Sequence, residues 1–146
     1  MAERKPGAPR RSVFADVGYE NYAEIIPADE EIFLAKANAD AAAGVDHWPT
    51  GARPYFHLFF TTTCAVPNVL NGVNIFVEVH TGVGATGWLN YRIIPVWEGL
   101  AAGYDYNAAH RNHLYVPARS VRFRACNVSD TNPVTLRGWI KQTGSV

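Results

Sequence analysis

The eight residues VNIFVEVH, at positions 73–80, decide the fold class of this chain. Branched aliphatic side chains occupy every second position of the stretch: Val73, Ile75, Val77 and Val79. The positions between them are polar or aromatic: Asn74, Phe76, Glu78 and His80. A period of two residues with one apolar face predicts a half-buried β-strand, because successive side chains of a strand point to opposite sides.

A second strand is predicted over residues 88–97, after a loop with glycine at positions 82, 84 and 87. This glycine-rich spacing favours a hairpin between the two strands. Alternation along the second stretch predicts four inward-facing side chains: Leu89, Tyr91, Ile93 and Trp97. Asn90 and Arg92 would then face outward, and Trp88 would begin the strand in the outward phase.

Residues 55–63 predict a strand in which both faces are largely apolar. One face carries Phe56, Leu58 and Phe60. The opposite face carries Tyr55, His57, Phe59 and Thr61. A strand that is apolar on both sides is typical of the middle of a sheet or of a surface covered by a partner.

Two strands close the chain, at residues 121–125 and 134–140, with the polar turn 127–133 between them. This arrangement predicts a C-terminal hairpin. With strict alternation in both strands, four cations and one tryptophan share a single outer face: Arg122, Arg124, Arg137, Trp139 and Lys141. We expect this face to bind a partner, because Trp and Arg are enriched at interfaces; a solvated basic face is the alternative.

Residues 29–44 fit two structures. The acidic start and the glycine at position 44 suit a helix, whereas the alternation around Ile32 and Leu34 suits a short strand. We favour a strand at residues 31–36, because the alanine-rich remainder has no apolar stripe. Together the segments predict an all-β protein, an antiparallel β-sandwich of jelly-roll type. The expected division is an extended basic arm at residues 1–12 and one sandwich domain at residues 13–146.

The composition of the chain limits what it can bind. Its 146 residues carry 13 Lys and Arg against 13 Asp and Glu, so the formal net charge is zero. A neutral chain has no general attraction to nucleic acid or to an anionic membrane. Charged residues make up only 18% of the chain and hydrophobic residues 48%, a balance that favours a subunit with partners.

The first twelve residues are more basic than the rest of the chain. They carry four cations, Arg4, Lys5, Arg10 and Arg11, against the single acid Glu3. Two prolines and a glycine interrupt regular structure in this segment. A solvated terminus is one interpretation. The other is a peptide that becomes ordered along a neighbouring subunit, in which case the four cations bind that partner.

No group of residues in the sequence points clearly to catalysis. Cys64 and Cys126 fall in opposite strand phases, so both are expected to stay reduced. Two sets of residues have loosely metal-like spacing: His110 with His113, and His57 with His80 and Glu78. Small β-barrel metalloenzymes need a tighter histidine pattern than either set provides. We therefore expect no enzyme, no catalytic residue, no metal and no cofactor.

The C-terminal third resembles a known class of proteins. The run LYVPARSVRFRACN at residues 114–127, the polar turn, and PVTLRGWI at residues 133–140 resemble the closing hairpin of small β-sandwich structural proteins of tailed bacteriophages. Proteins of this class include capsid decoration, neck and tail subunits.

The resemblance implies a non-enzymatic virion protein that docks on or cements a larger capsid or tail assembly. It also implies other virion subunits as partners, a homo-oligomer such as a trimer or a larger ring, and synthesis in the host cytoplasm without a secretion signal. Neither membrane insertion nor specific nucleic-acid binding is expected.

Two further functions stay open at this point. Trp88 and Trp139 in outward phase would suit a carbohydrate-binding or host-adhesion module, because their rings could stack on sugars. A small metal-dependent β-barrel enzyme is the third hypothesis, and it depends on the histidines alone.

Overall fold

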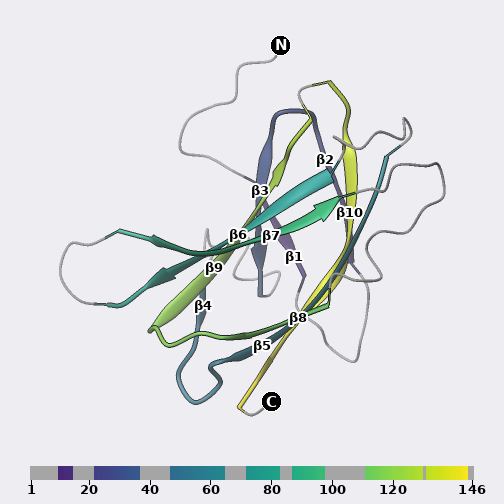
Figure 1. Ribbon diagram of the computed structural model, residues 1–146. Coiled ribbons are helices and arrows are strands. Elements are labelled where there is room, and N and C mark those ends of the chain that lie inside the picture. The colour runs from purple at the N-terminus through teal and green to yellow at the C-terminus, as the bar shows by residue number, and fades with distance from the viewer. Residues whose placement is uncertain are drawn as a thin grey trace.

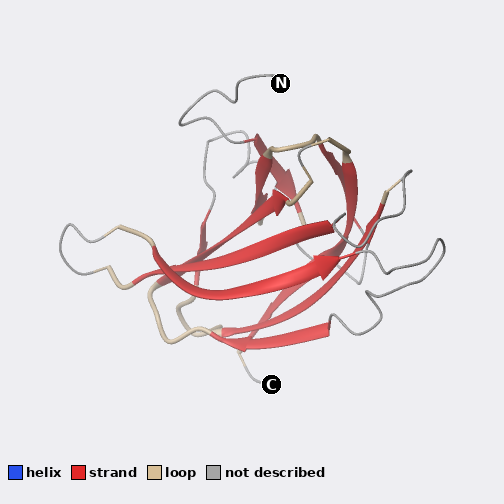
Figure 2. Ribbon diagram, turned by 45° about the horizontal axis from the view of Figure 1, so that its top comes forward, coloured by secondary structure: helices blue, strands red, loops and turns tan. Residues whose placement is uncertain are grey.

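The described residues of the computed structural model form ten β-strands in two facing sheets (Figures 1 and 2). The structure describes residues 10–14, 22–36, 47–64, 72–82, 87–97, 111–129 and 131–144. Over these ranges no helix is long and apolar enough to cross a membrane. The predicted all-β antiparallel sandwich is confirmed.

The first sheet has the strand order β1-β3-β9-β6-β7, and β4 pairs with a further part of β9. Its strands are β1 (Arg10–Val13), β3 (Glu31–Ala35), β4 (His47–Pro49), β6 (Gly72–His80), β7 (Leu89–Trp97) and β9 (Ser120–Asn127). β1 runs parallel to β3, and the other described pairs of this sheet are antiparallel.

The second sheet has the strand order β2-β10-β5-β8. Its strands are β2 (Tyr22–Ile26), β5 (Tyr55–Thr63), β8 (Arg111–Tyr115) and β10 (Val134–Thr143). All three pairings in this sheet are antiparallel. β5 lies between β10 and β8, as its two apolar faces predict.

The strand pairs are nested along the chain. β6 pairs with β7, β5 with β8, β3 with β9, and β2 with β10. From the innermost pair outward along the sequence, the pairs lie in the first, second, first and second sheet in turn.

Inward-facing side chains from both sheets pack into one core. Trp48 of β4 contacts Phe123 of β9 and Phe56 of the opposite sheet edge-on, with 5.9 Å between ring centroids in both cases. Its indole nitrogen Nε1 donates to the carbonyl oxygen of Leu34 at 2.9 Å, so the buried polar group is satisfied. Full burial of one such aromatic side chain contributes about 1.5–3 kcal/mol.

The strand expected in the ambiguous segment is present. β3 covers residues 31–35 and buries Ile32 and Leu34 in the core. Residues 37–46, where the alternative helix would continue, lie outside the described residues. The strands predicted at 55–63, 73–80, 121–125 and 134–140 are also found, at or close to the expected bounds.

The predicted C-terminal hairpin is wrong. β9 pairs with β3, β4 and β6 of the first sheet, whereas β10 pairs with β2 and β5 of the second. The polar turn between them is therefore a corner that carries the chain from one sheet to the other. Alternation identifies each strand correctly, but the choice of pairing partner is not a local property of the sequence.

The corner is organised around the buried side chain of Asn127. Its Nδ2 donates to three carbonyl oxygens, those of Ile26 at 3.0 Å, Pro27 at 3.2 Å and Asn132 at 2.9 Å. Its Oδ1 accepts the backbone N–H of Ser129 at 2.8 Å. The side-chain amide of Asn127 thus hydrogen-bonds four main-chain groups of the corner.

The predicted phase of β7 is wrong as well. The side chains expected inside, Leu89, Tyr91 and Ile93, are 46%, 43% and 46% exposed, and the buried residues are Ile94 and Val96. The side chain of Trp97 lies outside the described residues.

A β-bulge explains part of this difference. The register with β6 passes from Val77↔Arg92 to Glu78↔Asn90, so Tyr91 is an extra residue in β7. An extra residue reverses the phase along the strand. The position of β7 at the edge of its sheet further reduces the burial that its outer half can reach.

The expected N-terminal arm is only partly covered by the structure. Residues 1–9 lie outside the described residues. Arg10, Arg11 and Ser12, the last three residues of the expected arm, belong to β1 and pair with Ile32, Phe33 and Leu34 of β3. These three residues are therefore part of the first sheet.

Candidate functional site

The single basic face expected at the C-terminus is divided between the two sheets. Arg122 and Arg124 lie on the outer face of the first sheet, between buried neighbours of β9. Arg137, Trp139 and Lys141 lie on the outer face of the second sheet. The expectation fails because β9 and β10 are in opposite layers of the sandwich. We call these surfaces the first outer face and the second outer face.

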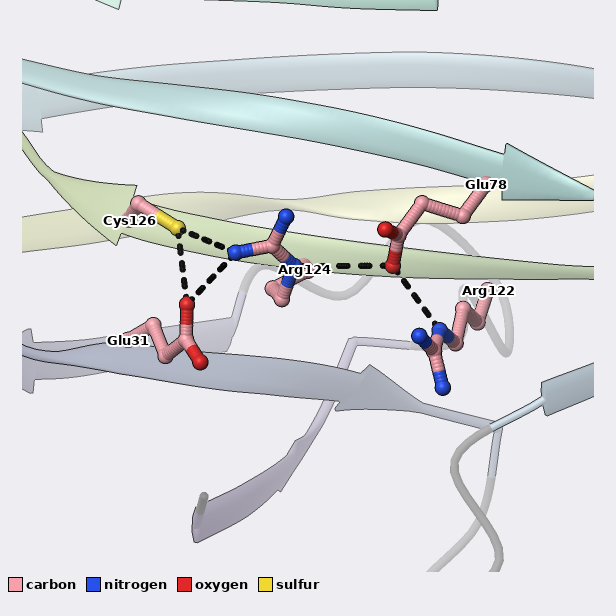
Figure 3. A network of polar contacts seen from close by, with 5 residues as sticks. All are labelled: Glu31, Glu78, Arg122, Arg124 and Cys126. Carbon is pink, nitrogen blue, oxygen red and sulfur yellow. Dashed lines mark hydrogen bonds and ion pairs between the residues drawn. The ribbon is translucent and has the colours of Figure 1, made fainter. Parts of the chain in front are cut away.

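On the first outer face the two arginines form ion pairs with acidic residues from neighbouring strands (Figure 3). Arg124 Nη1 lies 2.7 Å from Glu31 Oε2, and Arg122 Nε lies 2.8 Å from Glu78 Oε1. Arg124 Nε is also 3.5 Å from Glu78 Oε1, so Arg124 stands between the two carboxylates. The expected positive charge of β9 is therefore balanced within the chain.

Cys126 extends this network at its β3 side. Its Sγ lies 3.2 Å from Glu31 Oε2 and 3.4 Å from Arg124 Nη1. Burial lowers the pKa of Arg124, but the hydrogen bond to Glu31 and the nearby Cys126 and Glu78 outweigh it, so the pKa is raised overall. Arg124 is thus held firmly in its charged form.

Cys64 lies elsewhere and donates to the carbonyl of Pro133 at 3.4 Å, and the two cysteines are not joined by a disulfide.

The guanidinium groups of the same two arginines also lie over aromatic rings. The Arg122 guanidinium carbon lies 5.1 Å from the Phe33 ring centroid and 4.6 Å from that of Trp88. That of Arg124 lies 4.6 Å from the centroid of Phe76. Cation–π contacts of this kind add to the ion pairs and restrict both side chains. Trp88 thereby lies on the outer face, as its phase predicts.

The candidate arm residues are only partly placed. Arg4 and Lys5 lie outside the described residues, and only the backbone of Arg10 is described. Arg11 belongs to the first outer face, where its guanidinium carbon is 5.9 Å from the centroid of Phe33.

The second outer face has a different composition. Its described outward positions are Ala23 and Ile25 of β2, Tyr55, His57, Phe59, Thr61 and Thr63 of β5, His113 and Tyr115 of β8, and Thr135, Arg137, Trp139, Lys141 and Thr143 of β10. None of these positions holds an Asp or a Glu. The face therefore combines cations, imidazoles, hydroxyls and aromatic rings.

Rings are paired across the strands of the second outer face. Tyr55 faces Tyr115 with centroids 5.2 Å apart, and Phe59 is stacked on Trp139 at 5.9 Å with 21° between the ring planes. The β5 residues of the two pairs, Tyr55 and Phe59, are four residues apart, or about 13 Å along the strand. The result is a row of rings across β8, β5 and β10. The sequence predicts the outward phase of Phe59 and Trp139, but their contact depends on the β5–β10 register.

Of the two histidine sets with metal-like spacing, the set of His57, His80 and Glu78 is not assembled, and the set of His110 and His113 lies partly outside the described residues. His57 is on β5 and His80 on β6, in different sheets, and His110 lies outside the described residues. His57 instead faces His113 across β5 and β8, with 4.6 Å between centroids, and its Nε2 is 3.3 Å from Thr143 Oγ1. Among the described residues there is no group of three or more His, Cys, Asp and Glu that could hold a metal ion.

Comparisons with known proteins give little beyond the fold. No protein-family model matches the chain, and no curated protein matches it. A solved structure, the Yersinia pseudotuberculosis-derived mitogen, is similar over 86% of this chain and 85% of its own, with a TM-score of 0.47 and 12% sequence identity. A likeness at this level carries no statement about function.

Proposed function

We propose that this protein is a non-enzymatic structural subunit of a tailed-phage particle that docks through its second outer face. The observation that carries the proposal is the composition of that face. It gathers paired aromatic rings, Arg137 and Lys141, with no carboxylate at its described outward positions. Such a surface complements an acidic partner surface with apolar patches.

The arginines of the two outer faces differ in their contacts within the chain. The guanidinium groups of Arg122 and Arg124 are engaged by Glu31 and Glu78, so they contribute little to attraction of a partner. Arg137 is exposed, and its β2 neighbour in the sheet is the small residue Ala23. Ile25, the other outward residue of β2, is 59% exposed and adds an apolar rim to the same face.

Trp139 is the expected anchor of the docking surface. Stacking on Phe59 holds its ring in a defined position, so little conformational entropy is lost when a partner covers it. Large aromatic residues near the centre of an interface commonly carry most of its binding energy.

The phage context of the proposal comes from the resemblance of residues 114–140 to small virion subunits. The basic segment at residues 1–9 fits the same context, as a peptide that orders along a neighbouring copy. Homo-oligomers of three or more copies suit a subunit that surrounds a capsid or tail axis.

Light scattering of the purified protein tests the proposal. We expect a trimer or a larger ring, and we expect Trp139→Ala to weaken its self-association by about 2 kcal/mol, roughly thirtyfold. Trp139→Phe keeps a ring against Phe59 and should weaken association less. Trp88→Ala, on the first outer face, is the matched control and should leave association unchanged. A protein that stays monomeric at high concentration contradicts the proposal.

A carbohydrate-binding or host-adhesion module is the second candidate function, favoured by the row of rings on the same face. Under this alternative the wild type binds a glycan as a monomer, and Trp139→Ala removes that binding. A glycan screen on the same three variants therefore separates the two functions.

A further inference from the structure

A shallow hollow of about 440 Å³, largely open to solvent, lies where three loops of the sandwich meet. It is formed by the turn between β4 and β5, the loop between β8 and β9, and the residue that follows β6. Its walls include Thr50, Pro54, Thr81, Tyr115, Pro117 and Arg119. Pockets for small ligands have volumes in this range. The docking residues Arg137, Trp139 and Lys141 do not line it.

Hydrogen bonds connect the loops that form the walls. Val116 N donates to the Pro54 carbonyl at 2.8 Å, and Arg119 N donates to that of His80 at 3.1 Å. The backbone N–H of Thr50 donates to the Arg119 carbonyl at 3.1 Å, and its Oγ1 is also 2.9 Å from that oxygen. The hollow is therefore built before any ligand enters, which lowers the entropy cost of binding.

Arg119 supplies the charge of the hollow. Gly82 has φ of +81°, and a Cβ at this position would lie 2.5 Å from Arg119 Cδ. The side chain of Arg119, from Cβ to the guanidinium Nη1, thus lies against a glycine that leaves room for it, while the residue as a whole is exposed. The described residues that line the hollow include no Asp and no Glu. The hollow therefore favours an anionic ligand.

Tyr115 supplies a flat apolar surface at the rim. Its ring packs against Tyr55, and its carbonyl oxygen accepts a hydrogen bond from Tyr91 Oη at 2.7 Å. Although it is held in this way, Tyr115 is 52% exposed. An aromatic ring with one face in solvent can pack against the C–H face of a sugar.

We propose that this hollow binds an acidic sugar residue, of the uronate or sialate class. The carboxylate of the sugar pairs with Arg119, and its ring packs on Tyr115. Inorganic phosphate would use Arg119 but not the tyrosine ring. A neutral sugar would use the ring and leave the guanidinium without a counter-charge.

This inference goes beyond the proposed docking function. Tyr115 belongs to both surfaces, but Arg119 is not on the second outer face and Trp139 does not line the hollow, so the two proposals can fail independently. The probes are sialyllactose and a glucuronate disaccharide, compared with lactose and with inorganic phosphate. Binding is followed by the amide NMR shifts of residues 50–53, 115–116 and 118–119. We expect both acidic sugars to shift these signals, and lactose to bind at least about tenfold more weakly.

Variants assign the binding to the hollow. Arg119→Gln and Tyr115→Ala should each weaken binding of the acidic sugars by about tenfold or more, whereas Tyr115→Phe keeps the ring and should retain most of it. Arg92→Gln removes an exposed arginine outside the hollow and should change nothing. The melting temperature of each variant shows that the loss is not due to unfolding.

Three results would overturn the inference. The first is that neither acidic sugar shifts any signal at millimolar concentration. The second is that phosphate binds as well as the sugars and Tyr115→Ala has no effect, which would leave a simple anion site. The third is that Trp139→Ala removes binding while Arg119→Gln does not, which would place the sugar on the second outer face.

Discussion

The side-chain Nδ2 of Asn127 lies 3.0 Å from the main-chain oxygen of Ile26, although the two residues are 101 positions apart in the sequence. Ile26 is the last residue of β2 in the second sheet, and Asn127 is the last residue of β9 in the first. The bond therefore links the two layers at the corner where the chain crosses between them.

Replacing Asn127 by alanine is expected to lower the free energy of unfolding by about 2–3 kcal/mol, since the buried carbonyl of Ile26 loses its side-chain donor. Asn127→Asp keeps the acceptor for Ser129 but places an oxygen against the carbonyls, so it should also destabilise. Urea unfolding measures both. Asn90→Ala changes an exposed asparagine of β7 and is the control. A loss below about 0.5 kcal/mol for Asn127→Ala would show that the corner does not depend on this side chain.

Gly138 is expected to tolerate no side chain. Its φ is +149°, and a Cβ would lie 2.0 Å from the carbonyl oxygen of Phe59 on the neighbouring strand. Since that oxygen is main chain, relief requires the central β5–β10 pair to separate. Gly138→Ala should therefore cost more than about 3 kcal/mol or prevent folding. Gly87→Ala, where a Cβ meets nothing within 4 Å, should be neutral in the same thermal unfolding assay.

Arg124 is expected to act on stability and not on docking. Its side chain is 26% exposed and that of Glu31 is 15% exposed, so their ion pair is stronger than a surface pair. A double-mutant cycle with Arg124→Ala and Glu31→Ala should give a coupling energy of about 1–2 kcal/mol that changes little with salt. Self-association of Arg124→Ala should match the wild type. A coupling near zero would mean that the network of Figure 3 does not form in solution.

Two N-terminal deletions separate the arm from the sheet. Removing residues 1–9 should leave the melting temperature unchanged and weaken incorporation into the parent assembly, because the basic segment is proposed to bind a neighbouring copy. Removing residues 1–12 also takes away most of β1 and the contact between Arg11 and Phe33, so it should lower the melting temperature. Normal incorporation of the shorter deletion would contradict a docking arm.

The strands were predictable where alternation is continuous. Residues 73–80 alternate without a break and form a strand with the expected buried face. Residues 55–63, predicted to be apolar on both faces, form a strand between two others of the second sheet. β7 was predictable as a strand but not in its phase, because Tyr91 is an extra residue that no local pattern marks. Bulges follow from the pairing of two strands, so one strand alone does not reveal them.

The candidate site was predictable one strand at a time. Arg137, Trp139 and Lys141 face outward as the alternation of β10 predicts. Their grouping with Arg122 and Arg124 required a hairpin, and strand pairing is decided by contacts far apart in the chain. The ion pairs with Glu31 and Glu78 were missed for the same reason, since these acids come from β3 and β6.

The nested strand order has a consequence for how the protein is made. β9 lies between β3 and β6, and β10 lies between β2 and β5. While the ribosome has not yet released residues 120–143, β1 and β3 cannot join β6 and β7, and β2 cannot join β5 and β8. The strands made first therefore have unpaired edges until β9 and β10 are available. Such a state folds slowly and is prone to aggregation. Folding of both layers is completed when β9 and β10 insert between the strands made before them.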